Sequence, residues 1–348
     1  MKGSKKITII LLFLCFLLYL YLYRKKSEYF SEEIPDVGFP YKNVRDDKGN
    51  KLNVIAISAP FRDKTHVDLY NSYKNKGLSF IGISSYLDFP NHIDNPHEDR
   101  FHETENHNYP EMVKPGGWLH CFRKEGYTKP FENLPHMLMT ESDLKDTTSC
   151  VSSKDVKKEY DFIYICLKDS DTCQPGWQSY NRNWELAKKC LEVFCRDFKL
   201  RGLLVGREEC EFTRDCDGIV KVVPFAPYHE FQDLIKKSKW LFVPNIADAA
   251  PRVITESMCH DLPVLVNQNI LGGWHNVVPG VTGEFFNDET DVGDAVRRLL
   301  ENMKNDKYTS MKWFKENRGR EHSGVELAEF LKTNYPNLNN KDLKYAYI

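Results

Sequence analysis

Two carboxylates are the residues of this chain best placed to do chemistry. Asp248 follows an apolar strand expected to end at Val243, and Glu256 lies in the first turns of a helix expected over 252–260. A helix N-terminus offers unpaired N–H groups that suit a diphosphate. A carboxylate one turn further along can accept hydrogen bonds from a ribose diol, and the loop carboxylate can lie beside a sugar. Spacing alone also allows Asp248 to be an ordinary loop residue and Glu256 a solvated helix residue.

Three basic residues could complete such a site. A fixed cation beside a diphosphate or another anionic leaving group stabilises its negative charge. The candidates are Lys168, Arg182 and Arg207, which lie at the ends of expected strands or in the loops after them. Each of the three could instead be an ordinary surface charge.

The other polar motifs do not indicate a metal centre. Asp169-Ser-Asp171 is a D-x-D directly after a strand, and such a pair can hold a divalent cation on a diphosphate. The motif is short, and Asp215-Cys-Asp217 repeats it by chance. The ten cysteines lack the repeated C-x-x-C spacing of a zinc site. We therefore predict no metal site, while the redox state of the cysteines stays open.

The candidate residues lie where strands and helices alternate most regularly. Nearly all-apolar strands separated by amphipathic helices indicate a parallel sheet that is covered on both faces. In such doubly wound domains, ligands bind in the loops beyond the carboxyl ends of the strands. The expected strands are 162–166, 202–205, 219–223, 240–243 and 263–266, and the expected helices are 184–198, 229–238, 252–260 and 292–302.

A smaller β-α-β unit precedes this region. Strand 52–60, helix 63–76 and strand 78–84 imply a second parallel sheet. From 88 to 117 the chain is rich in His, Asn, Asp, Glu and Pro and has no apolar periodicity, which indicates a long loop. The Ser, Thr and Lys residues of 147–158 indicate a linker between two domains.

The N-terminus carries a targeting signal. Residues 7–23 are an unbroken apolar and aromatic run, flanked by Lys5-Lys6 and Arg24-Lys25-Lys26, and about 17 residues can just span a bilayer. No small residues follow the run, which argues against cleavage. We predict a tail and transmembrane anchor over 1–26 and a polar stalk over 27–50. The short tail favours a signal anchor of ER or Golgi type with the N-terminus in the cytosol, but the lack of an N-x-S/T sequon keeps a cytosol-facing globule open.

Composition sets broad limits. The 348 residues exceed what one small core organises, and 41% hydrophobic with 28% charged residues is typical of globular proteins. The net charge of −2 shows no basic excess, so we expect no nucleic acid partner.

The stretch from Pro244 to Pro263 resembles the E-x7-E signature of retaining glycosyltransferase family 4. Asp248 stands in place of the first Glu, and Glu256 is the second. Gly272-Gly273, the segment 280–286 and the helix expected from 291 to 300 are similar to the closing elements of the same family. The resemblance covers about residues 156 to 320, and the first domain matches only in outline.

This resemblance implies an α/β protein with the GT-B fold, in which two Rossmann-like, doubly wound domains face a cleft. An acceptor-side domain would cover 51–150, a nucleotide-sugar domain 151–330 and a tail 331–348. Glu256 would bind the ribose hydroxyls and Asp248 the donor sugar. Besides the three basic candidates and Glu256, the donor-binding residues would be Ala250, Pro251, Arg252, Val253, Gly272 and Gly273.

The implied activity is transfer of a hexose-type sugar from a UDP- or GDP-sugar to a glycan, lipid or protein, with retention at the anomeric carbon. No cofactor beyond the co-substrate is expected. The sequence departs from the family pattern in two ways: Asp248 is one methylene shorter than Glu, and the family's basic clamp has no clean equivalent. A non-catalytic nucleotide-sugar-binding or scaffolding protein is therefore the alternative. A nucleotide-dependent oxidoreductase is disfavoured because no G-x-G-x-x-G opens a helix.

Overall fold

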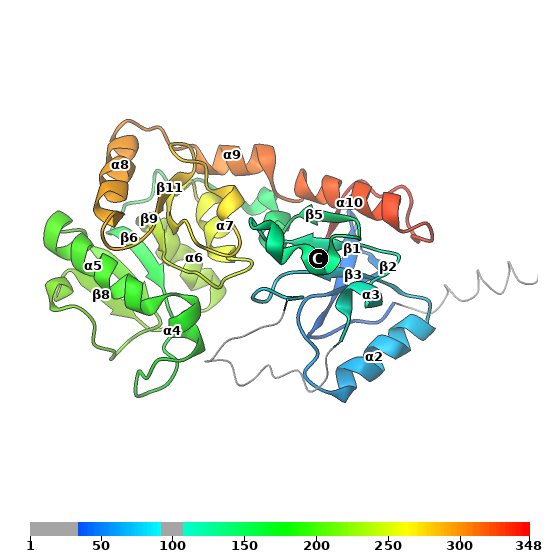
Figure 1. Ribbon diagram of the computed structural model, residues 1–348. Coiled ribbons are helices and arrows are strands. Elements are labelled where there is room, and N and C mark those ends of the chain that lie inside the picture. Colours follow the sequence, from blue (N-terminus) through cyan, green and yellow to red (C-terminus); the bar gives the residue numbers. More distant parts are fainter. Residues whose placement is uncertain (1–33, 92–106) are drawn as a thin grey trace, which may run out of the picture.

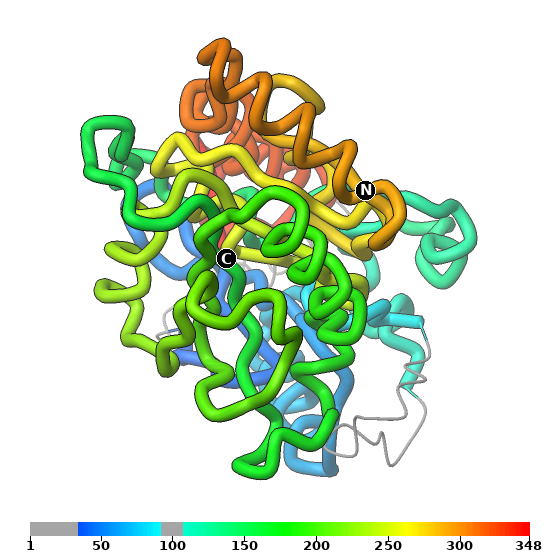
Figure 2. Tube along the Cα trace, turned by 90° about the vertical axis from the view of Figure 1, so that its left-hand side faces the viewer, coloured from blue at the N-terminus to red at the C-terminus, as the bar shows by residue number. Residues whose placement is uncertain are grey.

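The computed structural model describes residues 34–91 and 107–348, which form two sheets of six strands each (Figure 1). The apolar run 7–23, for which we predicted a membrane anchor, lies outside these residues. Among the helices that the structure does describe, none is long and apolar enough to cross a bilayer. Figure 2 views the molecule from the C-terminal domain, whose green to orange segments lie in front of the blue N-terminal strands.

The C-terminal sheet is entirely parallel, in the order β8-β7-β6-β9-β10-β11. Strand order therefore reverses between β6 and β9, the two neighbouring strands from which the chain winds outward in opposite directions. The carboxyl ends of such a pair form the crevice where ligands bind. The strands are β6 (Tyr160–Ile165), β7 (Gly202–Val205), β8 (Val220–Val223), β9 (Ser238–Val243), β10 (Val264–Asn267) and β11 (Gly283–Phe286).

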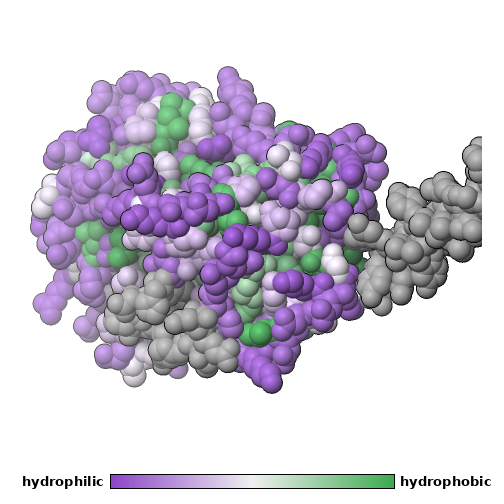
Figure 3. All heavy atoms as spheres, turned by 45° about the vertical axis from the view of Figure 1, so that its right-hand side comes forward, coloured by the Kyte–Doolittle hydropathy of each residue, from purple (hydrophilic) through white to green (hydrophobic). Residues whose placement is uncertain are grey.

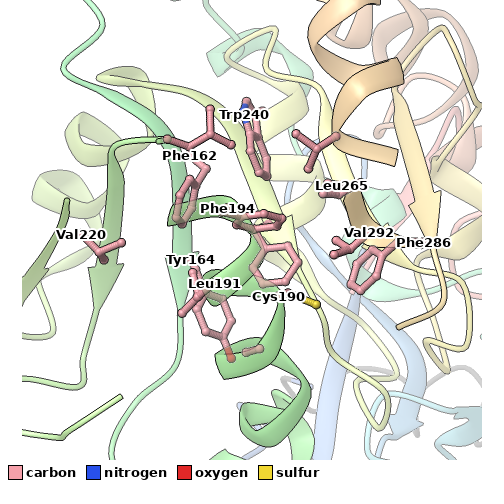
Figure 4. Packing of buried hydrophobic residues seen from close by; sticks show 14 of the residues in the cluster. Phe162, Tyr164, Cys190, Leu191, Phe194, Val220, Trp240, Leu265, Phe286 and Val292 are labelled. Atoms are coloured by element: carbon pink, nitrogen blue, oxygen red, sulfur yellow. The ribbon is translucent and has the colours of Figure 1, made fainter. Parts of the chain in front are cut away.

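Helices cover both faces of this sheet, as the alternating pattern predicted. On one face, Phe194 packs edge-on against Phe162 and Trp240, at ring-centroid distances of 5.3 and 5.5 Å (Figure 4). α5 and α8 cover this face, and α6, α7 and α9 contribute to the cluster on the other face. The helices are α4 (Trp177–Asn181), α5 (Trp184–Phe198), α6 (Tyr228–Lys236), α7 (Arg252–Met258), α8 (Val292–Lys304) and α9 (Ser310–Asn317).

The N-terminal sheet has the order β12-β1-β2-β3-β4-β5, and only β2 to β5 are parallel. Asp63 caps the first helix by accepting from the backbone N–H groups of Thr65 and His66. The elements are β1 (Tyr41–Asp46), β2 (Lys51–Ile57), β3 (Ser79–Ile83), β4 (Trp118–His120), β5 (His136–Leu138), β12 (Ala346–Tyr347), α2 (Lys64–Asn75), α3 (Tyr109–Met112) and α10 (Ser323–Asn334).

The ends of the globule differ from the expected stalk and tail. Residues 41–46, which we placed in the stalk, form β1, and the residues after 330 complete α10 and form β12. α9 and α10 run from the C-terminal domain back across the N-terminal sheet (Figure 1). The hydroxyl of buried Tyr335 donates to the carbonyl of Phe80 at 2.7 Å and accepts from the N–H of Gly117 at 3.2 Å. β1, near the start of the first described range, and β12, near the end of the second, pair with each other in this sheet.

Three disulfides stabilise the C-terminal domain: Cys150–Cys259, Cys173–Cys210 and Cys195–Cys216. The other described cysteines, Cys121, Cys166 and Cys190, are free and buried. The face of the molecule seen in Figure 3 is mostly hydrophilic, with apolar residues in small groups, because the helices cover the apolar faces of the sheets.

Candidate functional site

A pocket of about 400 Å³ opens where strand order reverses in the C-terminal sheet. Ile165, at the end of β6, and the loop between β9 and α7 contribute to its walls. We call it the switch-point pocket. Its size falls within the range of about 300–1,000 Å³ that is typical of small-molecule sites. Its polar lining residues are Arg182, Tyr228, Asn245, Asp248, Arg252 and Glu256, and its apolar lining residues are Ile165, Phe225, Phe231, Phe242, Val243, Ala250, Pro251 and Val253.

Asp248 is held in place by two donors. Nη1 of Arg182 donates to Oδ2 of Asp248 in a close ion pair, and Nδ2 of Asn245 donates to the same oxygen at 3.0 Å. The Asp248 side chain is only 14% exposed, so little water screens the pair. The two donors fix the carboxylate beside the pocket, where a side chain shorter than Glu is positioned by its neighbours.

Glu256 lines the same pocket from α7, so the structure brings both predicted carboxylates together. Burial raises the pKa of Glu256, and the positive charges of Lys145 and Arg252 oppose that rise. Lys145 comes from the N-terminal side of the molecule, directly after a short 3-10 helix (Glu141–Leu144). The N-terminal domain therefore contributes charge to a site that lies mainly in the C-terminal domain.

Of the three basic candidates, the structure places only Arg182 in the pocket lining. Nζ of Lys168 lies 3.4 Å from Asp171 and 3.9 Å from Glu208, away from the lining. Arg207 is 1% exposed and its guanidinium stacks on the ring of Trp184 at 4.4 Å. Because Arg207 is enclosed, its position indicates a role in packing.

The D-x-D segment also has a structural explanation. Asp169 accepts hydrogen bonds from the N–H groups of Gln178 and Ser179 at the start of α4, and Nη2 of Arg207 lies 3.3 Å from it. Asp171 is fully exposed. Within residues 34–91 and 107–348, no three His, Cys, Asp or Glu side chains form a group that could hold a metal ion.

The two predicted glycines face protein rather than the pocket. A Cβ on Gly272 would lie 1.8 Å from the carbonyl oxygen of Ala249 and 2.9 Å from Cβ of Cys121. Gly273 has a φ of +72°, and a Cβ there would meet Pro251 at 2.5 Å. Both positions require glycine because three backbone segments pack closely behind the β9–α7 loop.

Two aromatic side chains at the mouth of the pocket were not identified from the sequence. Phe225 and Tyr228 are 66% and 59% exposed, although both are large and apolar. The hydroxyl of Tyr228 lies 3.3 Å from Nζ of Lys145, across the domain boundary. Phe225 lies between β8 and α6, and Tyr228 is the first residue of α6. This short segment has no apolar periodicity, so the sequence does not show whether its aromatic side chains bind a ligand or pack in the core. The Pro224 and Pro227 that flank Phe225 are the signal that could have indicated an ordered turn there.

A buried polar network joins the two domains beside this site. Asp143, in the Glu141–Leu144 helix, receives hydrogen bonds from Nε2 of His275 at 2.9 Å and Nδ2 of Asn276 at 2.8 Å. Burial alone would raise the pKa of Asp143, but the charge of His275 and these hydrogen bonds lower it to about 2. The pair fixes the loop after Gly273 against the N-terminal domain.

In sequence, the chain matches no known family of proteins and no curated protein. Its structure is similar to solved glycosyltransferases. The structure of HepE from Anabaena with UDP and glucose has a TM-score of 0.55 at 12% identity, covering 80% of this chain and 78% of HepE. The pneumococcal O-GlcNAc transferase GtfA, with UDP and GlcNAc, has a TM-score of 0.52 at 10% identity, covering 79% of this chain and 55% of GtfA.

TarM from S. aureus, in a complex that includes UDP, has a TM-score of 0.51 at 10% identity, covering 74% of this chain and 50% of TarM. The match thus spans half the length of TarM. At these identities the likeness defines the fold: the chain has the α/β GT-B fold of glycosyltransferases, with two domains that each contain parallel strands.

Proposed function

We propose that the protein is a glycosyltransferase that moves a hexose-type sugar from a UDP- or GDP-sugar to a glycan, lipid or protein acceptor, with retention at the anomeric carbon. The observation that carries the proposal is the meeting of Asp248, Glu256 and Arg182 in one pocket at the strand reversal of a GT-B fold. Such a crevice is where this class of sheet binds nucleotides.

The lining residues fit the parts of a nucleotide sugar. Glu256 would accept hydrogen bonds from the ribose hydroxyls, and Phe225 and Tyr228 offer exposed rings on which a base can stack. Arg252 lines the pocket without an ion-pair partner among the described residues, so it can neutralise a diphosphate. With the base, ribose and diphosphate assigned to these residues, we assign the Asp248 carboxylate to the donor sugar.

In the transfer step, the bond between the anomeric carbon and the diphosphate oxygen breaks, and a bond from that carbon to an acceptor oxygen forms. The acceptor hydroxyl loses its proton to the departing phosphate oxygen, so charge balances. Positive charge develops on the sugar ring, and the Asp248 carboxylate beside it would stabilise that charge. Arg182 both fixes Asp248 and adds positive charge near the leaving group.

One observation favours a second candidate, a non-catalytic nucleotide-sugar-binding protein. Arg182 already compensates the charge of Asp248, so this carboxylate could serve only to order the pocket. The two functions differ in turnover, not in nucleotide binding.

We also propose that residues 1–26 anchor the protein in a membrane and that the globule lies on the lumenal side. Three disulfides among the described residues support this placement, because structural disulfides persist in oxidising compartments. A slower mobility on gels after reduction, with alkylation of six cysteines only after reduction, would agree with it; thiols at these positions in the native protein would contradict it.

The test of function is nucleotide release from a panel of UDP- and GDP-sugars, together with calorimetric titration of UDP and GDP. Glu256→Gln places an amide donor where the ribose diol also donates. Losing this charged hydrogen bond should cost about 1.5–3 kcal/mol, or roughly ten- to a hundredfold in nucleotide affinity, with little change in melting temperature.

Glu301→Gln, on the exposed side of α8, is the matched control and should bind as the parent does. Equal nucleotide affinity in Glu256→Gln and the parent would contradict the proposed ribose contact. Binding without release from any sugar nucleotide would favour the non-catalytic candidate.

A further inference from the structure

We propose that a second pocket, between the two domains, binds an anionic group of the acceptor, a phosphate or a carboxylate carried on a sugar ring. The inference rests on the proposed function and gives its acceptor a chemical class. The pocket has a volume of about 180 Å³ and lies between the loop after β4 and the loop after β10. Pockets that enclose a whole drug-sized ligand exceed about 300 Å³, so this one fits a single group of a larger molecule.

The position of this interdomain pocket suits an acceptor. Ile246 lines it, and the neighbouring Asn245 and Asp248 line the switch-point pocket. The carbonyl of Ile246 accepts from the N–H of Leu271 at 2.9 Å, which joins the β9–α7 loop to the far wall. Because both pockets share this loop, the interdomain pocket adjoins the proposed donor site.

The charged residues that line the pocket indicate the charge of its ligand. Among its nine lining residues, the charged ones are Arg123 and Lys124, and none is a carboxylate. The guanidinium of Arg123 stacks on the ring of Trp274 at 4.4 Å, and Nη1 donates to the carbonyl of Gln268 at 3.3 Å. Arg123 is exposed to solvent, and no carboxylate pairs with it in the described part of the chain. A fixed guanidinium with unused donors and no counter-charge is suited to an oxyanion.

Aromatic surface lies beside these cations. Phe122 and Tyr127 both line the pocket and stack with ring centroids 5.3 Å apart; Phe122 is buried, so half-buried Tyr127 offers the accessible aromatic face. An aromatic face next to a cation fits a sugar ring with an attached anion better than a free inorganic ion, since the ring covers apolar surface. Lys124 is exposed at the rim, where it can meet the same anion.

The test uses the full-length chain in a neutral detergent, saturated with UDP, and three probes of similar size: glucose 6-phosphate, glucuronate and methyl glucoside. Binding is measured by ligand-observed NMR. We expect at least one anionic probe to bind about tenfold more tightly than methyl glucoside. Lys124→Gln should weaken that anion about fivefold and leave methyl glucoside unchanged. Lys129→Gln, an exposed lysine outside the pocket, is the control and should have no effect.

The two anionic probes separate the sources of the charge: preference for glucose 6-phosphate indicates a phosphorylated acceptor, and preference for glucuronate indicates a uronic acid. Equal binding of all three probes, failure of both anions to bind, or equal effects of Lys124→Gln and Lys129→Gln would overturn the proposal. UDP affinity, titrated separately, should be the same in both variants. If the parent protein does not bind UDP, that result would count against the proposed function rather than against the anion site.

Discussion

At the residue scale, the ion pair between Asp248 and Arg182 can be tested by a substitution that removes charge without changing size. In Asp248→Asn, the side chain keeps its size and can still accept a hydrogen bond from Arg182, but the negative charge beside the sugar is lost. If that charge stabilises the transition state, kcat should fall about 10²- to 10³-fold while nucleotide affinity stays nearly unchanged. Steady-state kinetics and calorimetry measure the two quantities. If Asp248→Asn is as active as the parent, Asp248 has no part in the transfer step and only orders the loop.

The raised pKa of Glu256 implies that nucleotide affinity depends on pH. Its pKa is raised by burial, and the ribose hydroxyls would donate to the charged form. Nucleotide affinity should therefore be constant above this raised pKa and fall as the pH drops through it, because binding must then release a proton. Titrations in buffers of different ionisation enthalpy measure the proton release. Glu256→Gln should lose this part of the pH dependence, whereas a parallel dependence in the variant would assign it to another group.

At the scale of elements, one hydroxyl, that of Tyr335 directly after α10, hydrogen-bonds to the N-terminal sheet at two points. Tyr335→Phe leaves the Phe80 carbonyl and the Gly117 N–H without this partner inside the core. An unsatisfied buried group costs about 1–3 kcal/mol, so the free energy of unfolding should fall by that amount. Tyr160→Phe is the control, because the hydroxyl of Tyr160 has no partner in the part of the chain that the structure describes. Equal melting temperatures for the two variants would contradict this account of α10.

At the scale of the molecule, the two chain ends differ in importance. Deleting 331–348 removes β12 and the core residues Leu331, Tyr335, Leu338, Leu343 and Ala346. We expect the N-terminal domain then to lose its cooperative thermal transition, since the last turn of α10 and the segment after it would no longer complete the core on one face of the sheet. Deleting 1–26 should instead leave a soluble protein that unfolds cooperatively, because a segment rich in Glu, Asp and Lys separates the apolar run 7–23 from the strands of the sheet. A normal transition after the first deletion, or aggregation after the second, would contradict these expectations.

The elements of the C-terminal domain could be predicted from the sequence because each depends on local pattern. Helix 184–198 and strand 202–205 were predicted with the bounds that α5 and β7 have, since an amphipathic period and an apolar run are visible within one segment. Asp248 and Glu256 were found for the same reason: a loop and the helix after it place both at one end of the sheet.

Tertiary structure decided the features that depend on distant partners. The strands at 41–46 and 346–347 pair with each other across nearly the whole chain, and such short polar segments have no strand pattern of their own. Arg207 and Arg182 look alike in sequence, but the first is enclosed against Trp184 and the second reaches Asp248. Tyr228 and Lys145 meet only because two domains pack together, and the local sequence around a residue does not encode which distant surface it faces.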